Sequence, residues 1–477
     1  MNLRLQVTSG LRWVAGTRFL GQLFTWTVTI AVLRLLTPAD YGLLAMATVF
    51  VDFLAMMAQF GLGAAVIQAV SVDERKLQQI FGMVVVANLG LFIVMYFAAP
   101  LIATFFQEQR LIPIVRVLSM QYILAIFAMI PDAELSRKLD YRRLSLVELT
   151  ASIAASLTTL GLALTGSGVW ALVWGSLLGV LWRTVALNLL SPFFKWPRFS
   201  YQGTRELLLF GGNVTVTRIL WFVYSQADVI IAGKVLGKEL LGSYSVAMHL
   251  ASFPTNKISA IVNQVSFPAF ARIQHDRERY ASNFLLAVRL LSFCVFPVLW
   301  GISSIAPELV SVLLGSKWLL STVPLQLLAL IMPVHMFAPF MNTAALGLGR
   351  ADIAAKQVLI ASLIMPAAFL IGSQWGLVGL AAAWLVAFPL VFIGAMVLFL
   401  QIIRLRIRDL LGAMAPPVAA SLGMYAMVAV IRVILGPATG EVARMTALIF
   451  AGIVAYGVLS LVINRDGCRE VIRTLQG

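Results

Sequence analysis

The sequence has little charge and very few cysteines for its length. Of its 477 residues, 12% are Asp, Glu, Lys or Arg and 61% are hydrophobic, whereas a soluble domain has about 25% charged and about 45–50% apolar residues. Because so few charges cannot cover a water-exposed surface, a chain of soluble domains is excluded. The two cysteines, Cys294 and Cys468, are too few for a disulfide framework or a metal cluster.

Long apolar runs account for most of the chain. A transmembrane helix needs about 20 mostly apolar residues, and the sequence predicts an all-α polytopic membrane protein with about fourteen such helices. The runs are 10–35, 40–68, 78–103, 113–135, 146–166, 168–192, 207–233, 240–268, 282–306, 322–347, 354–374, 376–402, 410–435 and 443–463. Glycines at Thr165–Gly168 and Gly372–Gly376 predict tight hairpins between antiparallel spans, because glycine adopts the dihedral angles of short turns.

Basic residues outnumber acidic ones, 35 to 20, and they alternate between the two sides of these spans. Twenty-two of the 35 fall on the side of the N-terminus and about eight on the other. Cytoplasmic segments are enriched in Lys and Arg, so we expect both termini to be cytoplasmic. A nucleic-acid partner is not expected, because it would require basic residues clustered on a soluble face.

The chain contains an internal repeat. Eight of the 34 residues at 14–47 recur 200 positions later, among them Arg18 as Arg218 and Gly42 as Gly242. Because the copies begin in the first and the seventh span, an even offset of six, both copies cross the membrane in the same direction. This predicts parallel six-helix lobes at 1–200 and 201–405, followed by a two-helix hairpin and tail at 406–477. Parallel repeats with a substrate site between them are typical of transporters.

Five basic residues remain inside the apolar runs: Arg18, Arg183, Arg218, Lys257 and Arg289. Burying such a charge costs at least about 2.5–3.5 kcal/mol, so these residues normally face protein or a water-filled cavity. We therefore predict a cationic interior that binds an anionic substrate such as a phosphate or pyrophosphate. The alternative for Arg183 and Arg289, which lie toward the ends of their spans, is that they extend to the membrane interface.

Polar residues follow single helix faces. Gln22 continues the face of Arg18 on the first span, and Asn256 and Asn263 belong to a polar stripe on the eighth span. These side chains are predicted to line the same interior; the alternative is hydrogen bonding between helices. Glycines 175 and 179 form a small-xxx-small pattern that favours close helix packing.

Three titratable residues are candidates for ion coupling: Asp52, Asp228 and His249. The alternative for His249 is a hydrogen-bonded structural role. No GxxxxGK[ST], HExxH or GxSxG motif is present, so we expect no cofactor, metal or enzymatic activity. Transport would then use an ion gradient or the gradient of the substrate.

Several segments resemble a known family. They are Leu35–Gly42 (LLTPADYG), Arg116–Ser119 (RVLS), Arg137–Leu144 (RKLDYRRL) and Gly168–Leu172 (GVWAL). These are similar to segments of the Wzx-type polysaccharide exporters, which are lipid-linked oligosaccharide flippases of the multidrug/oligosaccharidyl-lipid/polysaccharide superfamily. The resemblance implies a V-shaped pair of six-helix lobes that alternates between inward- and outward-open states.

The resemblance also implies a function and a location. It implies transfer of an undecaprenyl-pyrophosphate-linked glycan across the bacterial inner membrane for surface polysaccharide synthesis, with a polymerase and a chain-length regulator as pathway partners. Family members use cavity arginines for the anionic part of the substrate, and Arg18 and Arg218 match in position. Membrane lipid is the surrounding partner, and we expect the chain to work as a monomer.

Two other functions remain open. A multidrug antiporter of the same fold would favour acidic cavity residues, which the basic excess opposes. An integral-membrane polysaccharide polymerase or glycosyltransferase would carry its catalytic residues on large extramembrane loops, whereas the outside connections here reach only about 15 residues by the span limits above.

Overall fold

The computed structural model describes residues 21–58, 74–138, 140–193, 195–199, 205–436 and 439–463, apart from the side chains at 58, 74, 76, 205–218, 260, 261 and 263–265. Over these ranges the chain is helical and contains no strand, which confirms the predicted all-α class. It forms two compact units. Unit 1 comprises residues 1–222 and 237–242, and unit 2 comprises residues 223–236 and 243–477.

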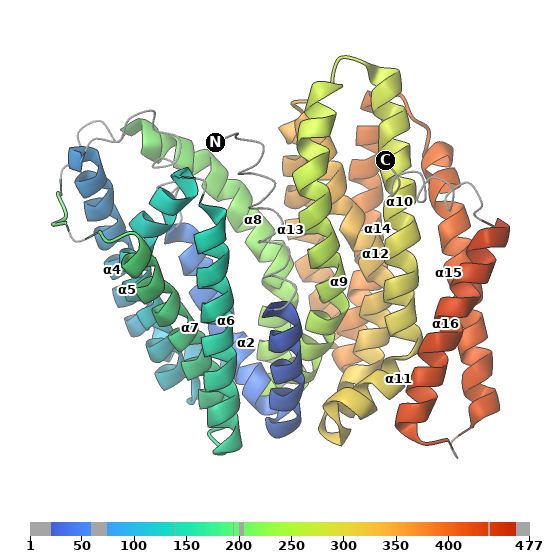
Figure 1. The fold of residues 1–477 in the computed structure, drawn as a ribbon, viewed down its shortest axis with the longest axis horizontal. Coiled ribbons are helices and arrows are strands. Elements are labelled where there is room, and N and C mark those ends of the chain that lie inside the picture. The colour runs from blue at the N-terminus through green and yellow to red at the C-terminus, as the bar shows by residue number, and fades with distance from the viewer. Residues whose placement is uncertain are drawn as a thin grey trace. The chain divides into compact units, whose positions relative to one another are not determined.

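Unit 1 is built around one central helix (Figure 1). Its described helices are 21–35, α2 (Pro38–Ala58), α4 (Glu74–Phe106), α5 (Leu111–Arg137), α6 (Tyr141–Leu164), α7 (Val169–Leu190) and the first part of α8 (Arg205–Val235). Helix α5 packs against α2, α4, α6 and α7, whereas α4 lies at the edge of the unit.

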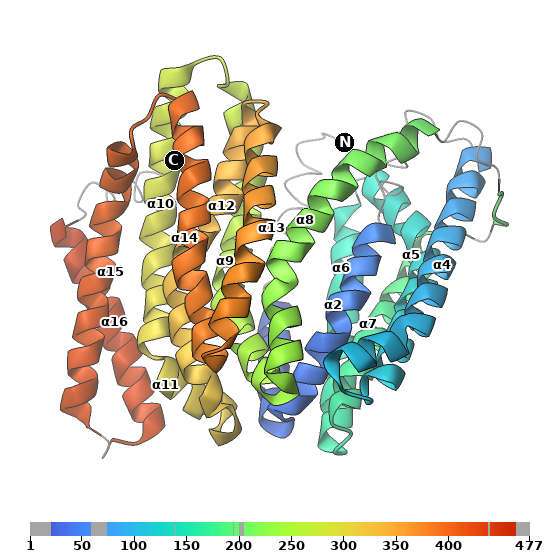
Figure 2. The same cartoon turned by 180° about the vertical axis from the view of Figure 1, so that it is seen from behind.

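Unit 2 contains the remaining helices (Figure 2). They are the end of α8, α9 (Gly237–Arg272) from residue 243 onward, α10 (Arg277–Ser304), α11 (Ala306–Leu309), α12 (Thr322–Gly347), α13 (Ala351–Ser373), α14 (Gly376–Ile402), α15 (Ile407–Leu435) and α16 (Glu441–Ile463). A π-helical turn (Val310–Leu314) and a 3₁₀ turn (Ser316–Ser321) connect α11 to α12. Helix α12 packs against α10, α13 and α14.

Eleven helices within the described residues are long and apolar enough to cross a membrane. They include α14, whose bounds of Gly376–Ile402 equal those of the predicted run. Helices α8 and α9, of 31 and 36 residues, are long enough to cross but are not among the eleven. The first predicted run begins outside the described residues, so the count of fourteen stays a prediction.

The segment Leu35–Gly42 forms the start of α2. Thr37 caps the helix: its backbone N–H and its hydroxyl both donate to Asp40 Oδ2, at 2.9 and 2.7 Å. Pro38 occupies the first helical position, where its missing N–H costs no hydrogen bond. This pattern of Thr with an acidic residue three positions later is a capping box. The same segment ends on Gly42, which has a packing role.

Gly42 and Gly242 make a reciprocal close contact. A Cβ on Gly42 would overlap the carbonyl of Lys238, and a Cβ on Gly242 would overlap the carbonyl of Pro38. Residues 38 and 238 are themselves 200 positions apart, which is the offset of the repeat. The start of α2 and the start of α9 therefore approach each other closely through backbone atoms at equivalent positions of the sequence repeat.

Glycine also explains the contact of α6 with α7 and the turn between them. A Cβ on Gly175 would overlap Thr159 Oγ1, and one on Gly179 would lie 2.9 Å from the Cβ of Ala155. The small-xxx-small pattern thus allows α7 to approach α6 closely, as predicted. The connecting hairpin contains Gly166 at φ +76°, a conformation that strongly favours glycine. The second predicted hairpin, before α14, contains Gly376 at φ +67°.

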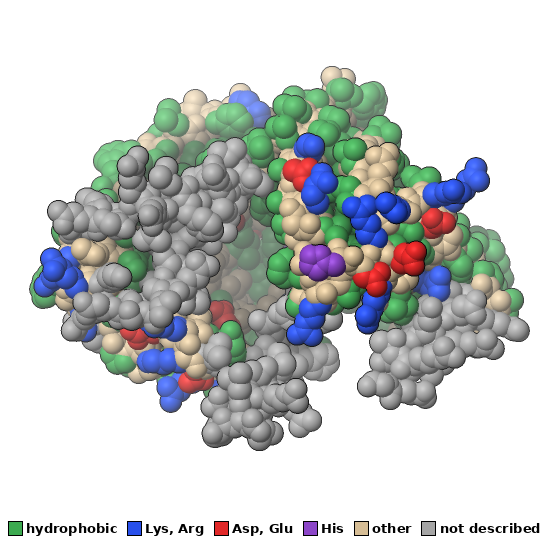
Figure 3. Space-filling model, turned by 90° about the horizontal axis from the view of Figure 1, so that it is seen from above, with side chains coloured by type: hydrophobic (Ala, Val, Ile, Leu, Met, Phe, Trp, Pro, Cys, Tyr) green, Lys and Arg blue, Asp and Glu red, His purple; other side chains and the backbone are tan. Residues whose placement is uncertain are grey.

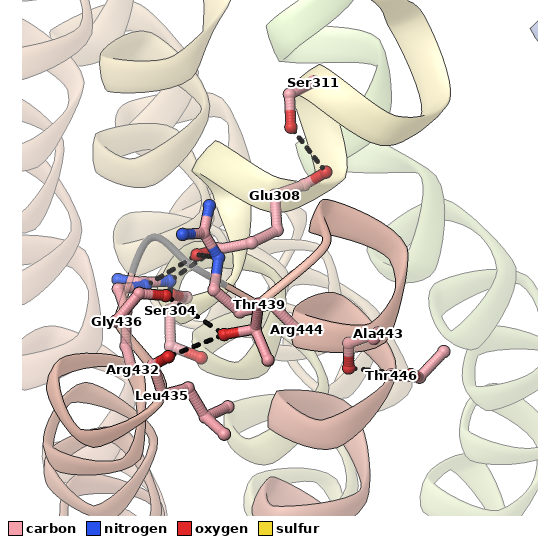
Figure 4. Close-up of polar contacts among 10 residues, drawn as sticks. All are labelled: Ser304, Glu308, Ser311, Arg432, Leu435, Gly436, Thr439, Ala443, Arg444 and Thr446. Atoms are coloured by element: carbon pink, nitrogen blue, oxygen red, sulfur yellow. Dashed lines mark hydrogen bonds and ion pairs between the residues drawn. The ribbon is translucent and has the colours of Figure 1, made fainter.

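The hairpin of α15 and α16 is joined to the rest of unit 2 by a charged cluster (Figure 4). The carboxylate of Glu308, on α11, lies 2.7 Å from Arg432 Nη2 on α15 and 3.3 Å from Arg444 Nε on α16. Only 1% of the Glu308 side chain is exposed. Arg432 also donates to the carbonyl oxygen of Ser304. Because the cluster draws on α10, α11, α15 and α16, it fixes the hairpin against the unit.

Basic side chains gather at one end of unit 2 (Figure 3). They lie at the connections from α9 to α10, from α12 to α13 and from α14 to α15, and include Arg272, Arg277, Arg279, Arg350, Lys356, Arg404, Arg406 and Arg408. All eight are exposed, and all were assigned to the cytoplasmic side from the sequence. The basic residues of these three connections therefore lie together at one end of unit 2. That this end faces the cytoplasm stays a prediction.

Candidate functional site

A buried carboxylate, Asp228, lies inside unit 2 and is 2% exposed. Its Oδ2 accepts hydrogen bonds from the hydroxyl of Tyr244 on α9, at 2.7 Å, and from Nε1 of Trp384 on α14, at 3.2 Å. Its Oδ1 accepts the backbone N–H of Val229 at 2.8 Å. Trp384 Nε1 also lies 3.0 Å from the Tyr244 hydroxyl. Three helices therefore supply the donors to one carboxylate.

A buried histidine extends this cluster. The hydroxyl of Tyr224, one helical turn before Asp228 on α8, lies 3.3 Å from Nε2 of His335 on α12. The imidazole packs edge-on against Trp384, with ring centres 5.4 Å apart. We refer to Tyr224, Asp228, Tyr244, His335 and Trp384 as the Asp228 cluster.

The chemistry of the Asp228 cluster suits a proton or a small cation. Within the described residues no basic side chain forms an ion pair with Asp228, and its hydrogen-bond donors are neutral. A buried carboxylate without an ionic partner is costly in a membrane and marks ion or proton pathways. Sequence reasoning identified Asp228 but missed the other four members of the Asp228 cluster. Only the spacing of Tyr224 and Asp228 by four residues indicated a shared helix face.

The other two coupling candidates lie elsewhere. Asp52 is exposed on α2 in unit 1, and His249 is exposed on α9 in unit 2. Neither belongs to the Asp228 cluster. The structure thus places only one of the three predicted titratable residues in a buried, hydrogen-bonded setting.

The polar face of α9 is accessible where its side chains are described. His249, Asn256 and Lys257 are exposed, and Ser252 and Ser259 are half-buried. The ammonium of Lys257 lies 5.6 Å from the centre of the Phe253 ring, close enough for a cation–π interaction. Asn263 falls on a position whose side chain lies outside the described part.

Arg183 lies between two carboxylates in unit 1. Its Nη2 is 2.9 Å from Asp132 Oδ1 on α5, and its Nε is 2.6 Å from Glu148 Oε1 on α6. The side chain is 32% exposed. Its charge is therefore compensated by two acids that the sequence analysis did not connect with it.

The remaining predicted residues are placed in part. Arg18 lies outside the described residues, and Arg218 lies in α8 at a position whose side chain is not described. Gln22 is half-buried in the helix at 21–35, and Arg289 is half-buried on α10.

Comparison with known proteins gives a consistent set of matches. Residues 31–323 match the model of a family described as "Polysaccharide biosynthesis protein". The chain is 26% identical over 390 residues to an uncharacterized membrane protein of the cps region of Klebsiella pneumoniae, a match that covers 81% of this chain and 80% of that protein. It is 27% identical over 369 residues to the succinoglycan biosynthesis transport protein ExoT of Rhizobium meliloti, covering 75% and 73%.

A solved structure shares the fold. The lipid II flippase MurJ, in an inward closed conformation, matches with a TM-score of 0.75 and 16% identity, over 95% of this chain and 99% of that chain. The chain therefore shares the fold of that structure.

Proposed function

The chain belongs to the polysaccharide biosynthesis protein family, and from that premise we propose that it is a transporter that flips a lipid-linked glycan across the membrane. The observation that carries this proposal is the family match over residues 31–323. The transport function named for the succinoglycan relative supports it. We propose a glycan transporter, and not a polymerase, a glycosyltransferase or a multidrug antiporter.

The finer features of the proposal concern the substrate and its route. The substrate is an undecaprenyl-pyrophosphate-linked oligosaccharide, moved across the bacterial inner membrane by alternating access of two lobes, with both termini of the transporter in the cytoplasm. The headgroup is the part that cannot cross hydrocarbon unaided, because burying charge in lipid is costly. The lipid tail gains nothing by leaving the bilayer, so it stays there during transfer.

The anionic part of the substrate is assigned to Arg18, Arg218 and Lys257. The repeat relates the two arginines, and the exposure of Lys257 on the polar face of α9 supports its inclusion. Gln22, Asn256, Asn263 and Arg289 are assigned to the same polar route. Arg183 is the least available of the predicted cations, because two carboxylates already accept its guanidinium hydrogen bonds.

Flipping by the purified protein in vesicles tests the function. A pyrophosphate-linked glycan lipid with a fluorescent headgroup is incorporated in both leaflets, and a membrane-impermeant reductant bleaches the outer one. Empty vesicles should lose about half of the signal, and vesicles with the protein should lose nearly all of it. A half-loss with the intact protein would contradict the transport function.

The triple variant Arg18→Gln/Arg218→Gln/Lys257→Gln tests the cationic mechanism separately. One charge-assisted contact is worth about 1.5–3 kcal/mol, so its loss weakens binding roughly ten- to a hundred-fold. A matched triple variant, Arg279→Gln/Lys356→Gln/Arg404→Gln, removes exposed charges from the end of unit 2 and should flip normally. Equal flipping by both triple variants would contradict the assignment of the cations while leaving the transport function intact.

A further inference from the structure

A groove lies between α4 and α5 in unit 1. It has a volume of about 540 Å³, within the size range of small-ligand sites. It is apolar apart from a single arginine and one tyrosine, and its lining residues are Phe92, Tyr96, Ile112, Pro113, Arg116, Val117 and Met120.

The position of the groove along the helices matches one leaflet of a bilayer. Helix α5 has 27 residues, so it is about 40 Å long at 1.5 Å per residue, and the hydrocarbon core is about 30 Å thick. Arg116 lies five residues from the start of α5, which is about 8 Å along its axis and near the edge of that core. Phe92 lies 14 residues before Phe106, the last residue of α4. It is therefore about 21 Å along the helix axis from that end. The groove thus extends from the headgroup level toward the middle of the bilayer.

Arg116 is held in place by Tyr96, and its charge has no acidic partner among the described residues. Its guanidinium carbon lies 4.6 Å from the centre of the Tyr96 ring, and its Nε donates to the Tyr96 carbonyl oxygen at 3.4 Å. The aromatic ring interacts with the guanidinium, and the one side-chain hydrogen bond found for Arg116 among the described residues uses Nε rather than the terminal N–H groups. Among the described residues no carboxylate forms an ion pair with Arg116.

We propose that this groove binds an anionic phospholipid of the bilayer, with the lipid phosphate on Arg116 and an acyl chain along Phe92, Val117 and Met120. A guanidinium fork is well suited to phosphate oxygens. One uncompensated cation matches the single charge of a phosphodiester, whereas a pyrophosphate-linked carrier would call for more than one. Tyr96 and Met120 are 37% and 43% exposed, so the groove is open to a lipid chain.

The proposal also gives a role to the segment Arg116–Ser119. Leu118 and Ser119 are buried, and the Ser119 hydroxyl donates to the Arg116 carbonyl oxygen at 2.6 Å. The burial of these two side chains anchors one side of the segment in the bundle, while the Arg116 side chain lines the groove on the other. Arg116 would therefore serve lipid binding rather than the glycan route.

Native mass spectrometry of the full-length protein in detergent tests the charge. We expect phosphatidylglycerol to bind more tightly than phosphatidylcholine with the same chains, and Arg116→Gln to weaken phosphatidylglycerol binding roughly ten- to a hundred-fold. Arg116→Lys should retain part of the affinity, and Arg110→Gln, which removes an exposed charge just before α5, should retain all of it. Equal binding of the two lipids, or unchanged binding by Arg116→Gln, would overturn the proposal.

A second variant tests the groove itself without removing the charge. Met120→Trp fills the apolar part, so it should weaken binding of long-chain phosphatidylglycerol while a short-chain form with the same headgroup binds as before. If Met120→Trp weakened the binding of both lipids, or of neither, the acyl chain would not lie along the apolar part of the groove as proposed. Tighter binding of undecaprenyl phosphate than of phosphatidylglycerol would overturn the assignment to a bilayer phospholipid. None of these outcomes depends on whether the protein flips a glycan.

Discussion

Asp228 receives three hydrogen bonds from neutral donors and forms no ion pair among the described residues. Such a carboxylate can exchange a proton or cation without breaking a salt bridge, so we propose it as the coupling residue in preference to Asp52 and His249. One elementary charge moved across 100 mV is worth about 2.3 kcal/mol, or roughly fifty-fold in a transport equilibrium. This is the size of effect that an imposed gradient should produce.

We expect Asp228→Asn to lose the response to a gradient while it still flips downhill. The amide keeps an oxygen that can accept from Tyr244, but it cannot change charge. Flipping in vesicles with and without an imposed proton or sodium gradient measures the effect. Asp52→Asn and His249→Gln serve as comparisons, and a gradient response that survives in Asp228→Asn but disappears in either of them would assign coupling to that residue instead.

Arg183 illustrates how far sequence reasoning reaches at the scale of a residue. Its place inside an apolar run was evident, and so was the need for a polar environment. Its partners, Asp132 and Glu148, are 51 and 35 residues away in the chain. Because hydropathy does not reveal which helices are neighbours, the sequence could not connect these acids with Arg183. The same limit hid Tyr244, His335 and Trp384, the members of the Asp228 cluster that lie on other helices.

At the scale of elements, the cluster of Glu308, Arg432 and Arg444 determines how the last hairpin is held. Glu308→Gln leaves two arginines beside a neutral group, and breaking a buried pair in this way costs about 3–5 kcal/mol. We expect a clear decrease in melting temperature, measured by fluorescence-detected size-exclusion chromatography after heating.

The ion pair of Arg350 with Asp352 offers a matched control for that prediction. Both side chains are more than 40% exposed, and surface pairs contribute little. Asp352→Asn should therefore melt close to the wild type. Equal melting temperatures for Glu308→Gln and the wild type would indicate that the hairpin is held by apolar packing alone.

The contact of α2 with the start of α9 depends on two glycines. Alanine at Gly42 or Gly242 would place a Cβ against backbone carbonyls, which cannot move aside as a side-chain end can. We expect each substitution to destabilise the protein by about 1–3 kcal/mol, the usual cost of overpacking. The destabilisation of the double variant Gly42→Ala/Gly242→Ala should differ from the sum of the two single effects, because both glycines belong to one contact.

Gly161, on α6, provides the control for these glycine substitutions. A Cβ there would have no atom within 4 Å, and alanine is favoured over glycine in a helix by up to about 1 kcal/mol. Gly161→Ala should therefore melt at or above the wild-type temperature. If Gly42→Ala and Gly161→Ala behaved alike, close backbone approach at Gly42 would not limit stability.

A salt bridge also holds the start of α9 against the rest of unit 1. Lys238 Nζ lies 2.5 Å from Glu108 Oε2, in the connection between α4 and α5. Partial burial alone would raise the pKa of Glu108, but the hydrogen bond and charge of Lys238 together with Arg110 hold that pKa below its ordinary value. A lowered carboxyl pKa stabilises the folded state above the unfolded pKa, and this stabilisation is lost as the pH falls through the folded value. The salt bridge of Glu108 with Lys238 should therefore stabilise the folded state at neutral pH.

At the scale of the whole molecule, the fold was more predictable than the site. A membrane requires each crossing segment to be long, apolar and internally hydrogen-bonded, so span positions follow from local sequence. The family resemblance, carried by segments such as Leu35–Gly42, is confirmed by the family match. The same segments cap and pack helices in the structure. The substrate route depends on the arrangement of distant helices, so its residues remain proposals.

Orientation is the last property of the whole molecule that the charge pattern predicts. The α9–α10 connection lies at the basic end of unit 2, and the α15–α16 connection lies at the other end (Figure 1). Because positive charge is retained in the cytoplasm, we expect the first connection to be cytoplasmic and the second to face outward. Single cysteines test this in a background with Cys294→Ser and Cys468→Ser. His275→Cys and Gly440→Cys suit the purpose, since both positions are exposed and a Cβ at Gly440 meets no atom within 4 Å.

A membrane-impermeant maleimide applied to intact cells should label Gly440→Cys and spare His275→Cys until the cells are permeabilised. Labelling of both positions from outside would place them on the same side of the membrane. The helices from α10 to α15 would then cross it an even number of times. The reverse pattern would place the basic end outside and contradict the positive-inside assignment. A reporter fused after Asn464 should be active on the same side as position 275, because α16 returns the chain across the membrane after the outward connection. A reporter found on the side of position 440 would remove α16 from the set of membrane-crossing helices, and with it the predicted fourteenth span.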